Sequence, residues 1–165
     1  MMHVQAAFKL RDADWESDGD ALRHVRRIVF IDEQQIPESL EWDDDDPVSL
    51  HALAVDGQGH PIATGRLLQD GHIGRIAVLS EWRGHGVGAA LFKHILNTAE
   101  QHGYRALYLN AQTHAAGFYA KYGFVAAGPE FIEAAIPHIA MERLNRESPR
   151  RHRRGVMKRS PSKRL

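Results

Sequence analysis

Residues 76–95 constrain the fold of this chain more than any other stretch. The segment begins with the apolar run Ile76–Leu79, turns through polar residues, and continues with apolar residues at helical spacing. Glycines stand at positions 84, 86 and 88, where the turn meets the helix. The first N–H groups of a helix have no partner within it, and the helix dipole favours negative charge there. This strand–turn–helix unit therefore predicts a phosphate-binding site.

Two common phosphate-binding motifs fit these residues incompletely. A Walker A loop requires Gly-Lys-Ser/Thr, whereas this chain has Val87-Gly88-Ala89, with no lysine for a terminal phosphate and no hydroxyl for Mg²⁺. The run Gly84–Ala89 matches the dinucleotide pattern G-x-G-x-x-A, but that pattern expects an acidic residue roughly 20 positions later for the ribose. Residues 104–110 contain no carboxylate, so a Rossmann site is not predicted.

The segment Arg83–Gly88 resembles the acetyl-CoA signature R/Q-x-x-G-x-G/A of the GNAT acyltransferase superfamily. A second segment, Gln112–Phe124, is similar to the family element N-x-x-A-x-x-F-Y-x-K-x-G-F, with Gln112 where asparagine is usual. The resemblance covers residues 4–143. Features similar to the ElaA-type branch of the family are found at Val29–Gln34, Leu50–Leu53 and Ile136–Met141.

This resemblance implies an α+β fold, in which a mixed, mostly antiparallel central sheet is flanked by helices. It also implies acetyl-CoA as co-substrate and no metal. The backbone of Ile76 and Val78 is expected to hold the pantetheine arm, a strand N–H near Val78 to stabilise the oxyanion, and residues 83–89 to bind the pyrophosphate. The full set of expected cofactor-binding residues is Ile76, Ala77, Val78, Arg83, Gly84, His85, Gly86, Val87, Gly88, Ala89, Gln112 and Phe118.

Tyr119 falls at the position of the family's usual general acid. A phenol with an ordinary pKa of about 10 is protonated at neutral pH and is able to give a proton to a departing thiolate. The alternative is that Tyr119, beside Phe118, is an aromatic residue of the core. The match of the surrounding Phe-Tyr-x-Lys-x-Gly-Phe sequence favours catalysis.

His72 is the expected general base. It lies six residues before Val78, where some family members carry a glutamate, and histidine titrates near neutral pH. The alternative is that His72, which follows the turn signal Asp70-Gly71, merely begins a half-exposed strand. A water relay is a further alternative. The residues that compete with His72 for this role, and that are also candidates for contacting the acceptor, are Glu33, His51 and His138.

The resemblance implies an N-acetyltransferase that moves the acyl group directly to a primary amine, either a small amine or an exposed protein amine. The alternative is an acyl-CoA-binding or nucleic-acid-tethered module with little turnover. The sequence leaves the acceptor, the acyl chain length and the choice between monomer and homodimer open.

The zero net charge of the chain conceals an asymmetry. Residues 1–145 carry 12 lysines and arginines against 20 acidic residues, whereas residues 146–165 carry 9 basic residues against one glutamate. Residues 1–145 are expected to form one acyltransferase domain. Residues 146–165 are expected to be a disordered basic tail, the only part through which nucleic acid would bind.

The chain has no cysteine, so a disulfide scaffold, a thiolate nucleophile and a cysteine zinc site are excluded. The first residues do not resemble a signal peptide, and the longest aliphatic or aromatic run, Ile28–Ile31, is too short to cross a bilayer. We therefore expect a cytoplasmic protein that does not enter the membrane.

The pattern of apolar residues and turn signals predicts the order of the elements. We expect a strand at 4–10, a helix at 21–32 capped by Asp18 or Asp20, a solvated acidic loop at 33–47 and a hairpin at 50–68. A third strand at 72–78 and a helix at 86–102 with Gly103 at its C-cap follow. The last expected elements are a strand at 106–110, a short helix at 115–121, and strands at 123–125 and within 136–143.

Overall fold

The computed structural model describes residues 7–145. The chain divides after Gln101 into two compact units, and each is described by itself. Parts of the first expected strand and the whole basic tail, residues 146–165, lie outside the described residues. Within the described range, no helix has both the length and the apolar character that crossing a membrane requires.

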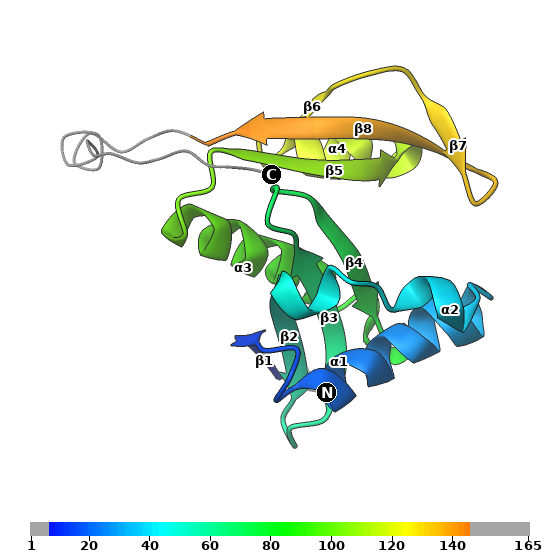
Figure 1. Ribbon diagram of the computed structural model, residues 1–165, viewed down its shortest axis with the longest axis vertical. Coiled ribbons are helices and arrows are strands. Elements are labelled where there is room, and N and C mark those ends of the chain that lie inside the picture. Colours follow the sequence, from blue (N-terminus) through cyan, green and yellow to red (C-terminus); the bar gives the residue numbers. More distant parts are fainter. Residues whose placement is uncertain (1–6, 146–165) are drawn as a thin grey trace, which may run out of the picture. The chain divides into compact units, whose positions relative to one another are not determined.

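The first unit is built on an antiparallel sheet with the strand order β1-β2-β3-β4 (Figure 1). Its tight turns contain Gly59 and Gly71, whose φ angles of 88° and 101° require a residue without a side chain. The predicted hairpin at 50–68 and the predicted turn at Asp70-Gly71 are therefore confirmed. The strands are β1 (Phe8–Ala13), β2 (Leu50–Asp56), β3 (Pro61–Leu67) and β4 (Ile73–Val78).

Two helices, α1 (Gly19–Arg26) and α3 (Val87–Gln101), cover opposite faces of this sheet (Figure 1). Each buries an apolar stripe at helical spacing, with Leu22 and Val25 fully buried on α1. The buried apolar residues of α3 are Val87, Leu91, Phe92, Ile95, Leu96 and Ala99. The predicted helix is thus confirmed, and Gly103, with φ 78°, follows its end.

The second unit is built around the long strand β8 (Ile136–Leu144), which pairs antiparallel with β5 (Ala106–Gln112), β6 (Val125–Ala126) and β7 (Phe131–Glu133). The short helix α4 (Ala116–Ala120) follows the 3-10 turn η4 (Thr113–Ala115). The predicted strand at 106–110 and the predicted short helix are therefore confirmed.

Strand β7 was not predicted from the sequence. It is joined to β8 through Ala134 and Ala135, which have φ angles of 52° and 65°. Tight turns of this kind usually contain glycine or asparagine, because other side chains disfavour positive φ. The sequence therefore carries no turn signal at this point.

The predicted α+β fold class, with mostly antiparallel strands flanked by helices, is confirmed. Instead of one mixed central sheet, the described strands form two sheets in which every pairing is antiparallel. The first helix differs from the prediction in its second half, because α1 continues as the π-helix η1 (Arg27–Glu33). The wider turns of a π-helix change which residues face the core, and Asp32 lies exposed near the end of this segment.

The start of α1 also differs from the prediction. Asp18 occupies the N-cap position, but its carboxylate does not cap the helix. Instead it accepts hydrogen bonds from Arg11 at 2.9 Å and 3.1 Å and from the N–H of Asp14 at 2.9 Å. Strand β1 also runs on to Ala13, beyond the predicted end of the first strand at residue 10.

The prediction of a solvated acidic loop at 33–47 is wrong in part. This segment contains the short helix α2 (Glu38–Glu41) and leads into the 3-10 turn η2 (Asp46–Val48). Asp44 and Asp45 are exposed, but Asp46 is fully buried. Buried carboxylates require positive partners, and here arginines from distant segments provide them.

Candidate active site

Strand β4 carries a bulge next to the expected cofactor-binding residues. In the pairing with β3, Thr64 faces Ala77 and Arg66 faces Gly74, so the single residue Gly65 stands opposite two residues, Arg75 and Ile76. Arg75 has φ 51°, which is in the left-handed region. A non-glycine residue there costs about 1–3 kcal/mol and is found most often at functional sites.

The backbone of Val78 points away from β3. The N–H of Leu79 donates to the C=O of Ile62 on β3 at 2.9 Å, and neighbouring residues of a strand direct their polar groups to opposite edges. The C=O of Val78 accepts a hydrogen bond of 2.9 Å from Nε of Arg83. Its N–H shares the same edge of β4, where the resemblance expects the pantetheine arm and the oxyanion.

We call residues 83–89 the glycine turn. Gly84 and Gly86 have φ angles of 84° and 81°, and an added Cβ at either would meet no atom within 4 Å. Glycine is therefore required by the backbone conformation and not by crowding. The C=O of Gly86 accepts the first bond of α3, from the N–H of Ala90 at 3.1 Å. The N–H groups at 87–89 precede this bond and lie in the first turn, where helices attract anions.

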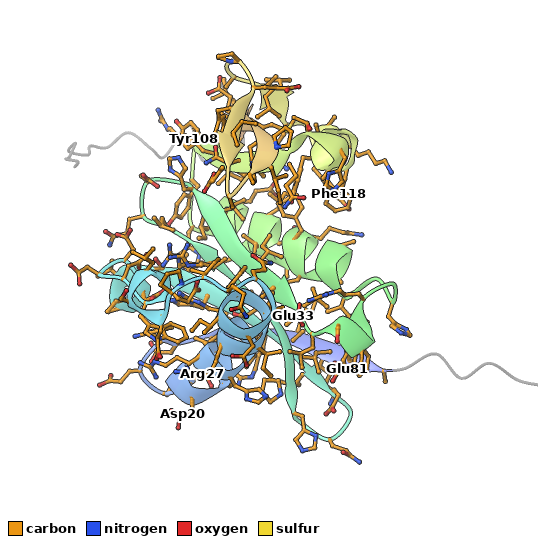
Figure 2. All side chains as sticks on the ribbon, turned by 90° about the vertical axis from the view of Figure 1, so that its right-hand side faces the viewer. Asp20, Arg27, Glu33, Glu81, Tyr108 and Phe118 are labelled. Atoms are coloured by element: carbon orange, nitrogen blue, oxygen red, sulfur yellow. The ribbon has the colours of Figure 1, made fainter. Side chains whose placement is uncertain are left out.

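The guanidinium of Arg83 is held at two points within the first unit. Besides its bond to Val78, Nη2 donates to Oε1 of Glu33 at 2.7 Å. Glu33, labelled in Figure 2, ends η1, so this ion pair ties the π-helix to the glycine turn. The carboxylate of Glu33 thus already has a cationic partner, which favours a structural role for Glu33 over the acceptor contact that the sequence suggested.

His72, the predicted general base, is exposed at the start of β4. Its Nδ1 lies 2.9 Å from Oδ1 of Asp70, and its backbone N–H donates to the same oxygen at 3.0 Å. Burial alone raises the pKa of Asp70, but the side-chain and backbone hydrogen bonds from His72 outweigh this effect and lower that pKa. The contact fixes the orientation of the imidazole ring.

His51 does not lie where it could contact an acceptor. It is buried, its Nε2 is 2.9 Å from the C=O of Asp46, and its ring stacks on Trp15 at 5.3 Å. Burial lowers the pKa of His51 below its ordinary value, which favours the neutral ring. These contacts favour a structural role for His51 over the acceptor contact that the sequence suggested.

In the second unit, Tyr119 lies on α4 within a group of aromatic rings. Its ring is 5.2 Å from Phe118 (labelled in Figure 2) and 6.4 Å from the buried Phe124, edge to face in both pairs. Burial raises the pKa of the Tyr119 phenol above its ordinary value. The hydroxyl is therefore protonated throughout the neutral pH range, as a proton donor must be.

Gln112 and His138 face each other across the β5–β8 ladder. Such pairs bring their Cβ atoms to about 4.5–5.5 Å. Nδ1 of His138 is 2.8 Å from the C=O of Ile136, and its ring stacks on Phe131 at 5.8 Å. An expected cofactor-binding residue and an expected acceptor-contacting residue are thus neighbours in this unit.

An ion cluster in the first unit was missed in the sequence. Asp46 accepts hydrogen bonds from Arg26 at 2.7 Å and Arg66 at 2.8 Å, and Glu41 accepts from Arg26 at 2.8 Å. The sequence did carry a signal for this cluster. An acidic run occurs in a chain that also has arginines among the apolar residues of a helix and of strands, where a buried guanidinium needs a negative partner. We define the ion cluster as Arg26, Arg66, Arg75, Glu41, Asp43 and Asp46.

The charges of the ion cluster balance, with three guanidinium groups and three carboxylates. Burial by itself raises the pKa of the Asp46 carboxyl. Hydrogen bonds from Arg26 and from the N–H of Asp43 outweigh burial and hold that pKa below its ordinary value. Asp46 is therefore ionised at neutral pH.

Comparison with known proteins agrees with this arrangement. A family model described as "Acetyltransferase (GNAT) domain" matches residues 28–144. The Uncharacterized N-acetyltransferase YjcF of Bacillus subtilis is 38% identical over 122 residues, which are 72% of this chain and 86% of that protein. Protein ElaA of Escherichia coli is 33% identical over 131 residues, which are 74% of this chain and 85% of that protein.

Solved structures show the same fold. An acyl-CoA N-acyltransferase from Pseudomonas aeruginosa has a TM-score of 0.75 and 33% identity, covering 83% of this chain and 99% of that one. Escherichia coli ElaA has a TM-score of 0.74 and 31% identity, with the same coverage of 83% and 99%. The resemblance to the ElaA-type branch is confirmed. This chain therefore belongs to the GNAT acetyltransferase family and is an acyltransferase.

Proposed function

We propose that this chain transfers the acetyl group of acetyl-CoA directly to a primary amine, either of a small molecule or exposed on a protein. The observation that carries the proposal is the bulged strand β4 leading into the glycine turn at the start of α3. Strand β4 offers main-chain groups for the pantetheine arm at the edge that faces away from β3, which we call its outer edge. The glycine turn offers the first N–H groups of α3 for the pyrophosphate.

The chemistry requires a proton donor and a proton acceptor. The amine nitrogen attacks the thioester carbonyl, and the N–H of Val78 is suited to stabilise the resulting oxyanion. The C–S bond then breaks, the thiolate takes a proton from the phenol of Tyr119, and the new amide loses the proton of the amine nitrogen. Tyr119 meets the first requirement of a donor, because its phenol is protonated at neutral pH.

His72 is the proposed acceptor of the amine proton. Its Nδ1 contact with Asp70 supports this role, because a carboxylate at one ring nitrogen fixes the tautomer and the orientation of the ring. Glu33 and His51 are weaker candidates, because Arg83 and Asp46 already hold their polar atoms. Gln112 and Phe118 remain proposed cofactor contacts, and His138 a proposed acceptor contact.

The test is release of free thiol from acetyl-CoA in the presence of a panel of primary amines, including polyamines and lysine peptides. The first unit carries an excess of acidic residues, which favours cationic acceptors. A thermal-shift series with CoA, NAD and ATP is the companion measurement, because a ligand that binds only the folded state raises the melting temperature. CoA should stabilise the protein more than NAD or ATP. Equal shifts for all three ligands, or no shift with CoA, would contradict the proposal.

The same experiments address the alternative, an acyl-CoA-binding module with little turnover. Such a module would show the CoA shift without thiol release for any amine. Full-length protein should also be compared with protein lacking residues 146–165, since weak, salt-sensitive nucleic-acid binding that disappears with these residues would favour tethering.

A further inference from the structure

The bulge in β4 rests on a residue whose backbone conformation is unfavourable. Arg75 has φ 51° although it is not a glycine, and it lies directly before Ile76 and three residues before Val78. Without other contacts to hold it, residue 75 would relax toward the extended region of φ and ψ. The pairing of β4 with β3 would then shift by one residue, and the N–H and C=O groups at the outer edge of β4 would turn to the other side.

The side chain of Arg75 is anchored by the ion cluster on the α2 side of the sheet. Its Nη2 donates to the C=O of Glu41 at 3.2 Å and to Oδ2 of Asp43 at 3.2 Å. Its Nε lies 3.1 Å from Oε2 of Glu41, at ion-pair distance but outside hydrogen-bond geometry. These partners are fixed in turn, because Glu41 is buried against Arg26 and Asp43 accepts from Arg66 at 2.7 Å.

The other residue of the bulge is held from the opposite face. A Cβ added to Gly65 would lie 3.3 Å from Cγ1 of Ile76 and 2.7 Å from Cδ1 of Ile95. Ile76 therefore packs closely over Gly65 beside α3. The bulge is clamped by apolar packing on one face and by ion pairs on the other.

We infer that Arg75 is a positioning residue for acyl-CoA binding. Its ion pairs with Glu41 and Asp43 hold residue 75 in the left-handed region, and this keeps the main-chain groups of Ile76 and Val78 at the outer edge of β4. The inference rests on the proposed function, because it assigns those groups to the cofactor. Arg75 itself need not touch the cofactor.

The test compares two substitutions that remove the same ion pairs but differ in backbone preference. Arg75→Met keeps a long side chain that disfavours positive φ, whereas Arg75→Gly adopts φ 51° without strain. Each variant is titrated with CoA by calorimetry, well below its melting temperature. We expect Arg75→Met to weaken CoA binding about tenfold or more, and Arg75→Gly to remain within a few-fold of the wild type.

Arg27→Met is the matched control. Arg27 belongs to the neighbouring η1 and makes an exposed ion pair with Glu38 at 2.6 Å, outside the ion cluster. Its loss should leave CoA affinity unchanged. If Arg75→Met does not fold, Arg75→Lys replaces it. The shorter reach of a lysine to Glu41 and Asp43 predicts an affinity between those of the wild type and Arg75→Met.

The outcomes separate this inference from the function on which it rests. Wild-type protein that does not bind CoA overturns both. Wild-type affinity in Arg75→Met overturns the inference alone, and so does equal weakening in the Gly and Met variants, since backbone conformation would then not be the cause. Failure of both the Gly and Met variants to fold also overturns it, because Arg75 would then serve stability only.

Discussion

At Tyr119, one oxygen atom separates a catalytic role from a packing role. Tyr119→Phe keeps the ring, which lies 5.2 Å from Phe118 and 6.4 Å from Phe124. If the phenol donates the proton to the thiolate, kcat should fall by roughly 10²–10⁴. The melting temperature and the affinity for CoA should change little. Wild-type kcat in this variant, with chemistry shown to be rate-limiting, would remove Tyr119 from the mechanism.

A second prediction at this scale concerns His72 and is read from a pH profile. His72→Ala removes the proposed base, so the acceptor must be deprotonated in solution before it attacks. We expect the rise of kcat/KM to move to higher pH, toward the pKa of the free amine. His60→Ala is the control, because His60 is exposed and contacts an aspartate, Asp56, in a different hairpin. Superimposable profiles for wild type and His72→Ala would exclude His72 as the base.

The glycine turn carries the third prediction, which concerns the start of α3. Gly86→Asp places a negative side chain where the pyrophosphate is expected, at a backbone position with φ 81°. Loss of charged hydrogen bonds of this kind should weaken CoA binding about tenfold to a hundredfold. Gly57→Asp adds the same charge at an open position of the β2–β3 hairpin, and its CoA affinity should equal that of the wild type. Calorimetry measures the CoA affinity of both variants, and circular dichroism checks that they are folded.

Two neighbouring aspartates of the acidic segment should behave differently, which is the fourth prediction. Asp46→Asn leaves Arg26 and Arg66 buried without their shared negative partner, and such a loss costs about 3–5 kcal/mol of folding free energy. Asp44 is exposed, so Asp44→Asn should change stability by less than about 0.5 kcal/mol. Urea unfolding of both variants measures the difference. Similar stabilities would mean that Asp46 is solvated after all.

This contrast explains what the sequence could predict about the elements. The hairpins followed from local signals, because Gly59 and Gly71 occupy positions that require positive φ. The burial of Asp46 depends on Arg26 and Arg66, each 20 residues away in the chain, and no local pattern reports such a pairing. Strand β7 was missed for the opposite reason, because its turn uses alanines where a local signal is normally present.

The candidate site was predictable to a similar degree. The glycine turn and Tyr119 could be proposed as site residues because their spacing matches family motifs that depend on neighbouring residues. No local sequence signal placed a bulge at Arg75, since its anchors come from Glu41 and Asp43, more than 30 residues earlier. Contacts to the acceptor were the hardest to propose, because an isolated histidine in a sequence does not reveal whether it is buried.

The stability of the whole molecule toward acid is the last prediction. The pKa of His51 is lowered in the folded protein, so the unfolded chain binds a proton first as the pH falls below about 6.5. The contribution of His51 to folding stability is therefore fully present above that pH. It falls by up to about 1.4 kcal/mol per pH unit until the folded pKa is reached. Asp46, whose pKa is also lowered, adds a further loss only below about pH 3.9.

The contribution of His51 is measured with His51→Gln, which does not titrate. Urea unfolding at pH 7 and pH 5.5 should show a smaller loss of stability in this variant than in the wild type, although its stability at pH 7 is lower. The groups that act on the ring are Asp46, which favours the charged form, and Arg26 and Arg66, which oppose it. Equal losses in both proteins would show that His51 does not control the acid response.

The balanced charges of the ion cluster also constrain how this protein is able to diverge. Loss of one residue of the ion cluster leaves a buried charge without its partner. Replacing a whole set of paired charges with apolar residues of similar volume, in contrast, is often neutral or even stabilising. Sequences in which only some residues of the cluster are replaced are therefore selected against, whereas a sequence in which the whole set is replaced is tolerated. Among relatives, these six positions should covary as a block, and a consensus sequence averaged one column at a time would mix incompatible solutions.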